Sequence, residues 1–235
     1  MLSKYNLRWL YTSDFISTID YYAKSLHTKV LPAFDDIAEE ADRVEKETAN
    51  RLSHCDPADI AEHVRDTGVD FTLMAHGVVQ GIVNMFTAGL HHLFEQQLLW
   101  LYRQELLVEW FRAVPPSALL TVQQARKRLL QDYKIDIEAF TSWSKLEELR
   151  LVANVVKHTD GPSCDALKQK RPDLFIHPTM KDDTPLDDPT VGMSPVYQPL
   201  SGEDVYISPE EFTRFVEATK KFWHELADAV DQLPD

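Results

Sequence analysis

Three side chains that could carry chemistry recur at four-residue spacing in the second half of the chain: Arg150, Asn154 and His158. In an α-helix, residues four apart lie about 40° apart around the axis, so all three share one face. An imidazole acts as an acid or a base near neutral pH. A guanidinium supplies a fixed positive charge, and an amide can orient a bound group. The spacing therefore predicts a candidate site on one face of a helix.

The helix that must carry these residues is predicted over 143–158. The segment Thr159-Asp160-Gly161-Pro162 should stop it, because it places a glycine near the C-cap and a proline directly after. Apolar residues between the polar positions supply its buried side: Leu149, Leu151, Val152, Val155 and Val156.

Two further helical segments are predicted before this one. Residues 14–53 place apolar side chains at the i, i+3/i+4 spacing of a helix, which Pro32 should kink or divide. The Asp56-Pro57 pair begins a long helix that runs to about Arg112, either continuous or broken near Gly68, before Pro115-Pro116 ends it. Because this helix is apolar on most sides, we expect it at the centre of a bundle. Three of its glycines would let a neighbouring helix approach closely: Gly77, Gly81 and Gly89.

The remaining segments are shorter. An amphipathic helix is predicted from Thr121 to Tyr133, with a basic patch at 126–128, and a short helix from Cys164 to Lys170. Ile176 to Pro199 is rich in proline and aspartate and is predicted to be an irregular, mobile loop, followed by a short extended piece at 205–207. Ser208 and Glu211 have the spacing of a capping box at the start of the final helix.

These segments predict an all-α fold: a helical bundle with one long central helix and a long Pro/Asp-rich loop before the C-terminal helix. An N-terminal helical arm covers residues 1–55, and the bundle covers 56–235 with its loop at 176–199. Only seven glycines in 235 residues and short β-branched runs argue against an all-β fold.

Composition limits the classes of function. The net charge of −14, from 24 basic and 38 acidic residues, excludes a general nucleic-acid coat protein but leaves room for a local basic site. The two cysteines, Cys55 and Cys164, have no metal-ligand spacing, which favours a reducing cytoplasm. No signal peptide is indicated at the start. The most apolar stretch, 69–101, contains many polar residues, so we expect a buried helix and no membrane span.

The architecture and the segment Ala153-Asn154-Val155-Val156-Lys157-His158 resemble HEPN-domain proteins, an all-α superfamily whose bundles usually dimerise. Its ribonuclease members carry an arginine, a polar residue that is often asparagine, about three variable residues and a histidine. Asn154 matches the polar position and His158 the histidine, whereas Ala153 stands at the arginine position. The nearest arginine is Arg150, one turn earlier on the same face. The segments 172–175 and 199–206 also look like uncharacterised bacterial proteins that we associate with this superfamily, so the resemblance covers roughly residues 60–230.

The resemblance implies a metal-independent endoribonuclease without a cofactor, acting as a homodimer in a bacterial stress, toxin–antitoxin or phage-defence system. Such enzymes assist attack of a ribose 2′-hydroxyl on the adjacent phosphate. His158 would be the acid/base, Asn154 the orienting amide, and Arg150 or Lys157 the phosphate partner. Three other residues are candidates for contacts with RNA: Glu95, which could face the Arg150 stripe, and Arg126 and Lys127 in the basic patch. The alternative is a catalytically inactive HEPN-like scaffold that binds a protein partner or RNA.

Structural interpretations stay open for the same residues. His158 could bind free carbonyls at a helix C-terminus, Asn154 could link helices, and Arg150 could pair with Glu147 or Glu95. A guanidinium that shares an open cleft with His158 would favour the enzyme, and one locked in a buried ion pair would favour the scaffold. Cys164 and Ser163 lack any signature of a nucleophile and are expected to be structural.

His91 and His92, together with Glu95, suggest a possible metal site, in which His91 and Glu95 have the i, i+4 spacing to bind one ion. The alternatives are polar residues buried in the bundle or at an interface, or a contribution to the HEPN-like site. Two ligands alone make a weak metal site, so no metal ligand is assigned.

Overall fold

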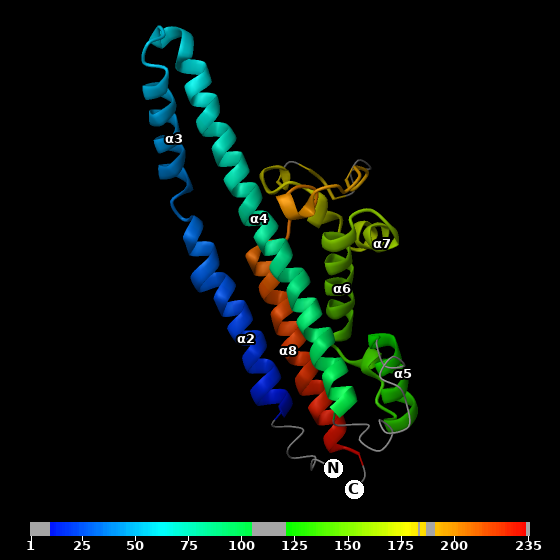
Figure 1. Ribbon diagram of the computed structural model, residues 1–235. Coiled ribbons are helices and arrows are strands. Elements are labelled where there is room, and N and C mark those ends of the chain that lie inside the picture. The colour runs from blue at the N-terminus through cyan, green and yellow to red at the C-terminus, as the bar shows by residue number, and fades with distance from the viewer. Residues whose placement is uncertain (1–9, 105–120, 183, 187–190, 234–235) are drawn as a thin grey trace.

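The computed structural model describes residues 10–104, 121–182, 184–186 and 191–233. This part of the chain is built from helices and contains no strand, so the predicted all-α bundle with one long central helix is confirmed (Figure 1). The α-helices are α2 (Ile16–Ser25), α3 (Ile37–Arg51), α4 (Pro57–Gln104), α5 (Val122–Tyr133), α6 (Trp143–His158), α7 (Pro162–Lys170) and α8 (Pro209–Asp231). Short π- and 3-10 turns join them: Leu10–Phe15, Leu26–Val30, Leu31–Phe34, Ile137–Ala139, Pro172–Phe175, Pro178–Met180 and Pro199–Ser201.

Helix α4 is the axis of the molecule. It runs for 48 residues without a break at Gly68, which corresponds to roughly 70 Å at 1.5 Å per residue. The Asp56 side chain accepts a hydrogen bond from the Ala58 amide at 2.9 Å, as expected of an N-cap. Helix α3 packs along its N-terminal half, and α2, α6 and α8 surround its C-terminal half (Figure 1). The expected end of this helix at Pro115-Pro116 lies outside the described residues.

The predicted N-terminal helix is divided, as Pro32 indicated. Its regular part ends at Ser25 and is followed by a π-helical turn, Leu26–Val30, and a 3-10 turn, Leu31–Phe34. Proline has no backbone N–H to donate within a helix, so the chain changes direction here before α3 begins. Helix α3 and the first half of α4 form an extended hairpin that projects beyond the rest of the bundle (Figure 1).

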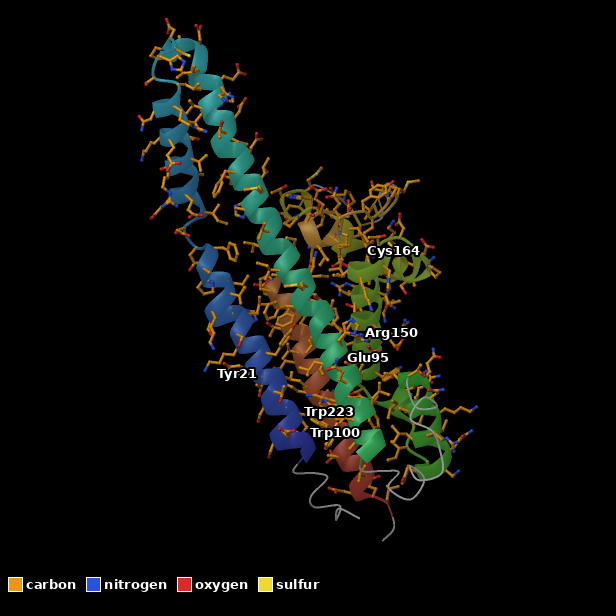
Figure 2. All side chains as sticks on the ribbon, in the orientation of Figure 1. Tyr21, Glu95, Trp100, Arg150, Cys164 and Trp223 are labelled. Carbon is orange, nitrogen blue, oxygen red and sulfur yellow. The ribbon has the colours of Figure 1, made fainter. Side chains whose placement is uncertain are left out.

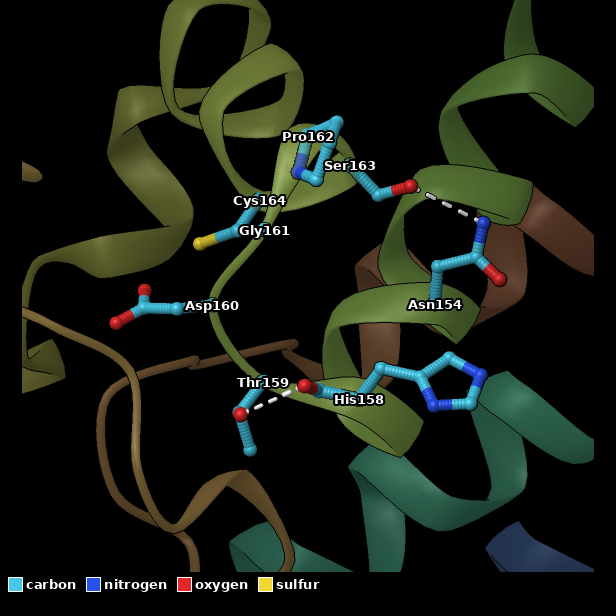
Figure 3. A pocket seen from close by; sticks show the side chains of 8 residues that line it. All are labelled: Asn154, His158, Thr159, Asp160, Gly161, Pro162, Ser163 and Cys164. Atoms are coloured by element: carbon cyan, nitrogen blue, oxygen red, sulfur yellow. Dashed lines mark hydrogen bonds between the residues drawn. The ribbon is translucent and has the colours of Figure 1, made fainter.

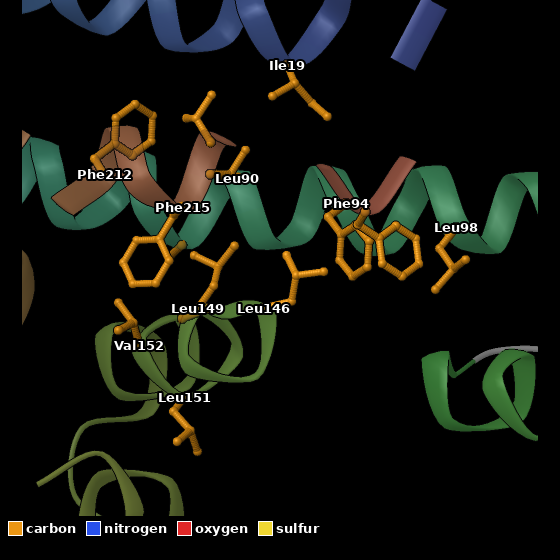
Figure 4. Close-up of a cluster of buried hydrophobic side chains, with 14 of the residues drawn as sticks. Ile19, Leu90, Phe94, Leu98, Leu146, Leu149, Leu151, Val152, Phe212 and Phe215 are labelled. Atoms are coloured by element: carbon orange, nitrogen blue, oxygen red, sulfur yellow. The ribbon is translucent and has the colours of Figure 1, made fainter. Parts of the chain in front are cut away.

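The core lies between the C-terminal half of α4 and helices α2, α6 and α8. Trp223 is fully buried, and its indole N–H donates to the Gln97 side chain at 3.1 Å, so the polar atom of this large ring has a partner. Aromatic and aliphatic side chains from four helices form this core (Figure 4), among them Ile19, Leu90, Phe94, Leu98, Leu146, Leu149, Val152, Phe212 and Phe215.

The segment that precedes α8 is held firmly against α4. The buried amide of Asn84 donates to the carbonyls of Pro199 and Val205 at 2.7 and 2.8 Å, and Gln80 donates to the Ile207 carbonyl at 2.9 Å. The extended piece expected at 205–207 therefore pairs with side chains of α4 instead of with a strand. Of the predicted loop 176–199, the described residues Ile176, Val196 and Pro199 are buried.

The most apolar part of α4 is less buried than the sequence predicted. By length and composition, the described stretch Pro57–Leu101 could cross a membrane, and 28% of its most apolar 18-residue window is buried in the bundle. In the first half of α4, four large apolar side chains are exposed: Val69, Leu73, Met74 and Val78.

The backbone at Leu200 lies very close to α4 at Gly81, but none of the described backbone lies as close to Gly68. Alanine substitutions at these two glycines therefore test the contact. A Cβ added at Gly81 would lie 2.0 Å from the Leu200 carbonyl oxygen, whereas at Gly68 it would meet only the end of the flexible Glu45 side chain. We expect Gly81→Ala to lower the free energy of unfolding by roughly 1–3 kcal/mol, because backbone must move. Gly68→Ala should be neutral or stabilising by up to about 1 kcal/mol, from helix propensity. Chemical denaturation of both variants measures this difference, and equal effects would contradict the described contact.

Candidate functional site

The candidate residues lie at the corner where α6 ends and α7 begins. Lys157 and His158 form the exposed last turn of α6. Thr159 then adopts a positive φ of 62° and Gly161 a φ of 148°, which turns the chain so that Pro162 can start α7. Glycine accepts such a conformation without cost, whereas Thr159 is strained in it. The predicted stop signal is therefore confirmed, and it creates a sharp corner in place of a loose loop.

A pocket of about 240 Å³ opens at this corner (Figure 3). Asn154 and His158 line it from α6, and the first turn of α7 lines the opposite side. The Asn154 amide donates to the Ser163 hydroxyl at 3.2 Å, which orients the amide across the pocket. The N-cap residue of α7, Gly161, makes no side-chain cap, and an uncapped helix N-terminus presents backbone N–H groups that attract anions. The full lining is Asn154, His158, Thr159, Asp160, Gly161, Pro162, Ser163 and Cys164.

Arg150 does not join this pocket. It lies two turns before His158 on α6, a rise of roughly 12 Å along the helix, and is not among the lining residues. Its guanidinium pairs with Glu147, with nitrogen–oxygen distances of 3.1–3.4 Å. The arginine side chain is 42% exposed, so this ion pair lies on the surface. Arg150 is therefore neither held in a buried ion pair nor placed in the same cleft as His158. Ala153, which stands where the resemblance to HEPN proteins would place an arginine, is buried.

The other predicted contact residues are dispersed. Glu95 lies on α4 beside His91 and His92, outside the pocket. Arg126 pairs with Glu138, and Lys127 is exposed on α5. Helix α5 lies beside the start of α6, at the end opposite to the corner (Figure 1). Of the proposed set, only Asn154 and His158 therefore share a cavity, with Lys157 exposed next to them.

A network of buried ion pairs connects α6, the residue after α7 and the start of α8. This network was not predicted from the sequence. The carboxylates of Glu148 on α6 and Glu211 on α8 are both buried. Lys145 and Arg171 each contact both of these carboxylates, and Arg171 also forms a two-pronged pair with Asp173 at 2.7 and 2.8 Å. Arg171 follows the last residue of α7, so the network fastens α6, the end of α7 and the start of α8 to one another. A clue was available, since Glu148 lies among apolar positions of α6.

The ionisation of Glu211 is strongly perturbed within this network. Burial alone would raise its pKa, but hydrogen bonds from Arg171 and Lys145 outweigh that effect and lower the pKa to about 2. Its backbone amide donates to the Ser208 hydroxyl at 3.1 Å, so the predicted N-cap is confirmed. The predicted second half of the capping box is wrong, because the Glu211 side chain binds Lys145, Arg171 and Arg214 instead of the backbone of Ser208.

The two nucleophile-type residues of the pocket have structural surroundings, as expected. Burial raises the pKa of the Cys164 thiol to about 11, so the reactive thiolate is suppressed near neutral pH. Ser163 accepts the hydrogen bond of Asn154. The pocket therefore offers one exposed imidazole and one oriented amide.

Comparison of the chain with family models, with curated proteins and with solved structures finds no match in any of the three.

The depressed pKa of Glu211 predicts how stability depends on pH. Its folded-state pKa of about 2 lies below its ordinary value of 4.5, so its contribution is complete above about pH 4.5 and is lost as the pH falls toward 2. We expect Glu211→Gln to lower the free energy of unfolding at pH 7 by on the order of 3 kcal/mol, and the gap to the unmodified protein to close at low pH.

Denaturant unfolding of both proteins at several pH values between 7 and about 2.5 measures this gap. Glu203→Gln, at an exposed carboxylate ahead of α8, serves as the control. A gap that stays constant over the whole pH range would show that the carboxylate is not held ionised by its partners.

Proposed function

We propose that this chain is a HEPN-like endoribonuclease that cleaves RNA without a metal, with its site in the pocket at the α6–α7 corner. One observation carries the proposal: the pocket brings His158 and Asn154 together opposite the first turn of α7. An acid/base residue that lines one pocket with the first turn of a helix suits a phosphodiester, because the helix N-terminus attracts the negative phosphate.

The reaction that these groups support is attack of a ribose 2′-hydroxyl on the neighbouring phosphorus. A P–O bond to the 2′-oxygen forms, the bond to the 5′-oxygen breaks, and the products are a 2′,3′-cyclic phosphate and a 5′-hydroxyl. One proton leaves the 2′-hydroxyl and one reaches the 5′-oxygen. His158 serves one of these transfers, and water or His158 of a second copy serves the other. Asn154, fixed by Ser163, positions a phosphate or ribose oxygen.

The phosphate partner is the incomplete part of this site. No lysine or arginine is among the described residues that line the pocket. Lys157 is exposed and adjacent to His158, so we assign it the role of phosphate partner. Arg150 would have to leave Glu147 to contribute, and as an exposed pair this interaction holds it by only about 0–1 kcal/mol.

The same observations favour one alternative, a HEPN-like scaffold that binds a protein partner or RNA without cleaving it. Arg150 is paired with Glu147, and the family's arginine position holds the buried Ala153. A site with an imidazole and an amide but no fixed guanidinium still binds an anionic ligand, but it lacks stabilisation of the charge that develops in the transition state.

Cleavage of mixed cellular RNA in EDTA by the purified chain tests the proposal. We expect cleavage by the unmodified protein, a loss of at least about a hundredfold in His158→Ala, and a similar direction in Asn154→Ala, because each removes a group that acts in the transition state. His158 and Asn154 are not fully buried, so these variants should keep the fold, which circular dichroism checks.

His224→Ala is the matched control, because His224 is an exposed histidine on α8, outside the pocket. Full activity in His158→Ala would refute the proposed site. RNA binding without cleavage that requires His158 and Asn154 would support the scaffold instead.

A further inference from the structure

A second cluster of chemically capable side chains lies on α4, away from the pocket. His91, His92 and Glu95 each offer one ligand atom, and these three atoms lie within 4.8 Å of one another. The sequence already suggested these three residues, with His91 and Glu95 as the i, i+4 pair. In the helix, Glu95 lies between the two histidines in angle, about 40° from His91 and about 60° from His92, so all three project to one side.

The distances approach those of a metal site. His91 Nδ1 lies 3.5 Å and His92 Nδ1 3.2 Å from Glu95 Oε2. A tetrahedral Zn²⁺ with ligands at about 2.0–2.1 Å would separate its ligand atoms by roughly 3.3–3.4 Å. Two of the three separations are therefore already close to the required value, and small side-chain rotations would bring the histidine nitrogens together.

His91 gives an independent sign that the cluster lacks a partner. Its Nδ1 atom is buried and has no hydrogen bond, although the Glu95 carboxylate is near, and the residue is only 6% exposed. Buried polar atoms in proteins are nearly always satisfied, so an exception points to an absent ligand.

The surroundings allow a cation to bind. Arg150 on α6 lies on this side of the molecule (Figure 2), and its positive charge opposes a cation. That charge is offset by its pair with Glu147. His92 is partly exposed, so the cluster is open to solvent on one side and leaves room for a water as a further ligand.

From this geometry we propose that His91, His92 and Glu95 bind a divalent transition-metal ion of the Zn²⁺ class. Two imidazoles and one carboxylate suit Zn²⁺, Co²⁺ and Ni²⁺ better than the all-oxygen ligation of Mg²⁺ or Ca²⁺. The site shares no residue with the His158 pocket, so it does not depend on the proposed RNA cleavage. The ion would fasten the buried histidine of α4 to its exposed neighbour.

Titration of the chelator-treated full chain with Zn²⁺ by calorimetry, and with Co²⁺ by its visible absorption, tests this site. We expect one saturable site per chain, the absorption of tetrahedral Co²⁺, and a higher Tm with Zn²⁺. His92→Gln and Glu95→Gln are partly exposed and should keep the fold, and each should weaken binding at least about tenfold. His224→Gln should bind as the unmodified chain does.

Two results would overturn the proposal. One is the absence of a saturable site in the unmodified chain. The other is equal binding by the unmodified chain, His92→Gln and Glu95→Gln, which would assign the metal to adventitious surface histidines. Lost binding in His91→Gln would be less informative, because this residue is buried and its substitution could also disturb folding.

Discussion

The arrangement of the C-terminal half depends on two buried carboxylates that need cations. Glu148 and Glu211 lie on different helices and face the same interior, where an unpaired charge costs several kcal/mol. Lys145 and Arg171 satisfy both of them. Because Arg171 comes directly after α7, the pairing fixes where α7 must end, and with it the corner between α6 and α7.

The pocket is a consequence of that corner. Helix α6 is anchored by its apolar face, which packs on α4 and α8. Its last turn is left exposed, and Thr159 and Gly161 reverse the chain within a few residues. Asn154 can therefore reach Ser163, nine positions later, and His158 lies beside the first turn of α7. The same geometry leaves Arg150 outside, since it faces Glu147 further along α6.

Local patterns in the sequence predicted the elements well. Apolar spacing, Pro32, the Asp56 cap, the Ser208 cap and the stop after His158 all correspond to observed features. These signals act over one or two helical turns, which is the range over which propensity and capping operate. The long uninterrupted α4 also follows from them, because a single glycine such as Gly68 weakens a helix by only about 1 kcal/mol.

Contacts between distant segments were not predictable in the same way. Arg171 and Glu211 are 40 positions apart and pair only because α7 and α8 are brought together. Glu211 had a local explanation as a capping residue, which hid its role in the ion network. Asn84 reads as one polar residue of an apolar helix, yet it binds carbonyls more than 110 positions later. The spacing of Arg150, Asn154 and His158 correctly placed them on one helix, but it did not show which of them share a cavity. The neighbouring helix α7 determines that only Asn154 and His158 do.

We propose that this chain binds RNA in the corner pocket. Nuclear magnetic resonance spectra of the labelled chain, recorded with a short RNA whose 2′-oxygens are methylated so that it cannot be cleaved, test it most directly. If RNA binds in this pocket, the resonances of the Asn154 side-chain amide and the His158 ring will shift first and saturate together with the backbone amides of 161–164. Shifts confined to the basic patch of α5, or no saturable shift at any RNA concentration, would contradict it.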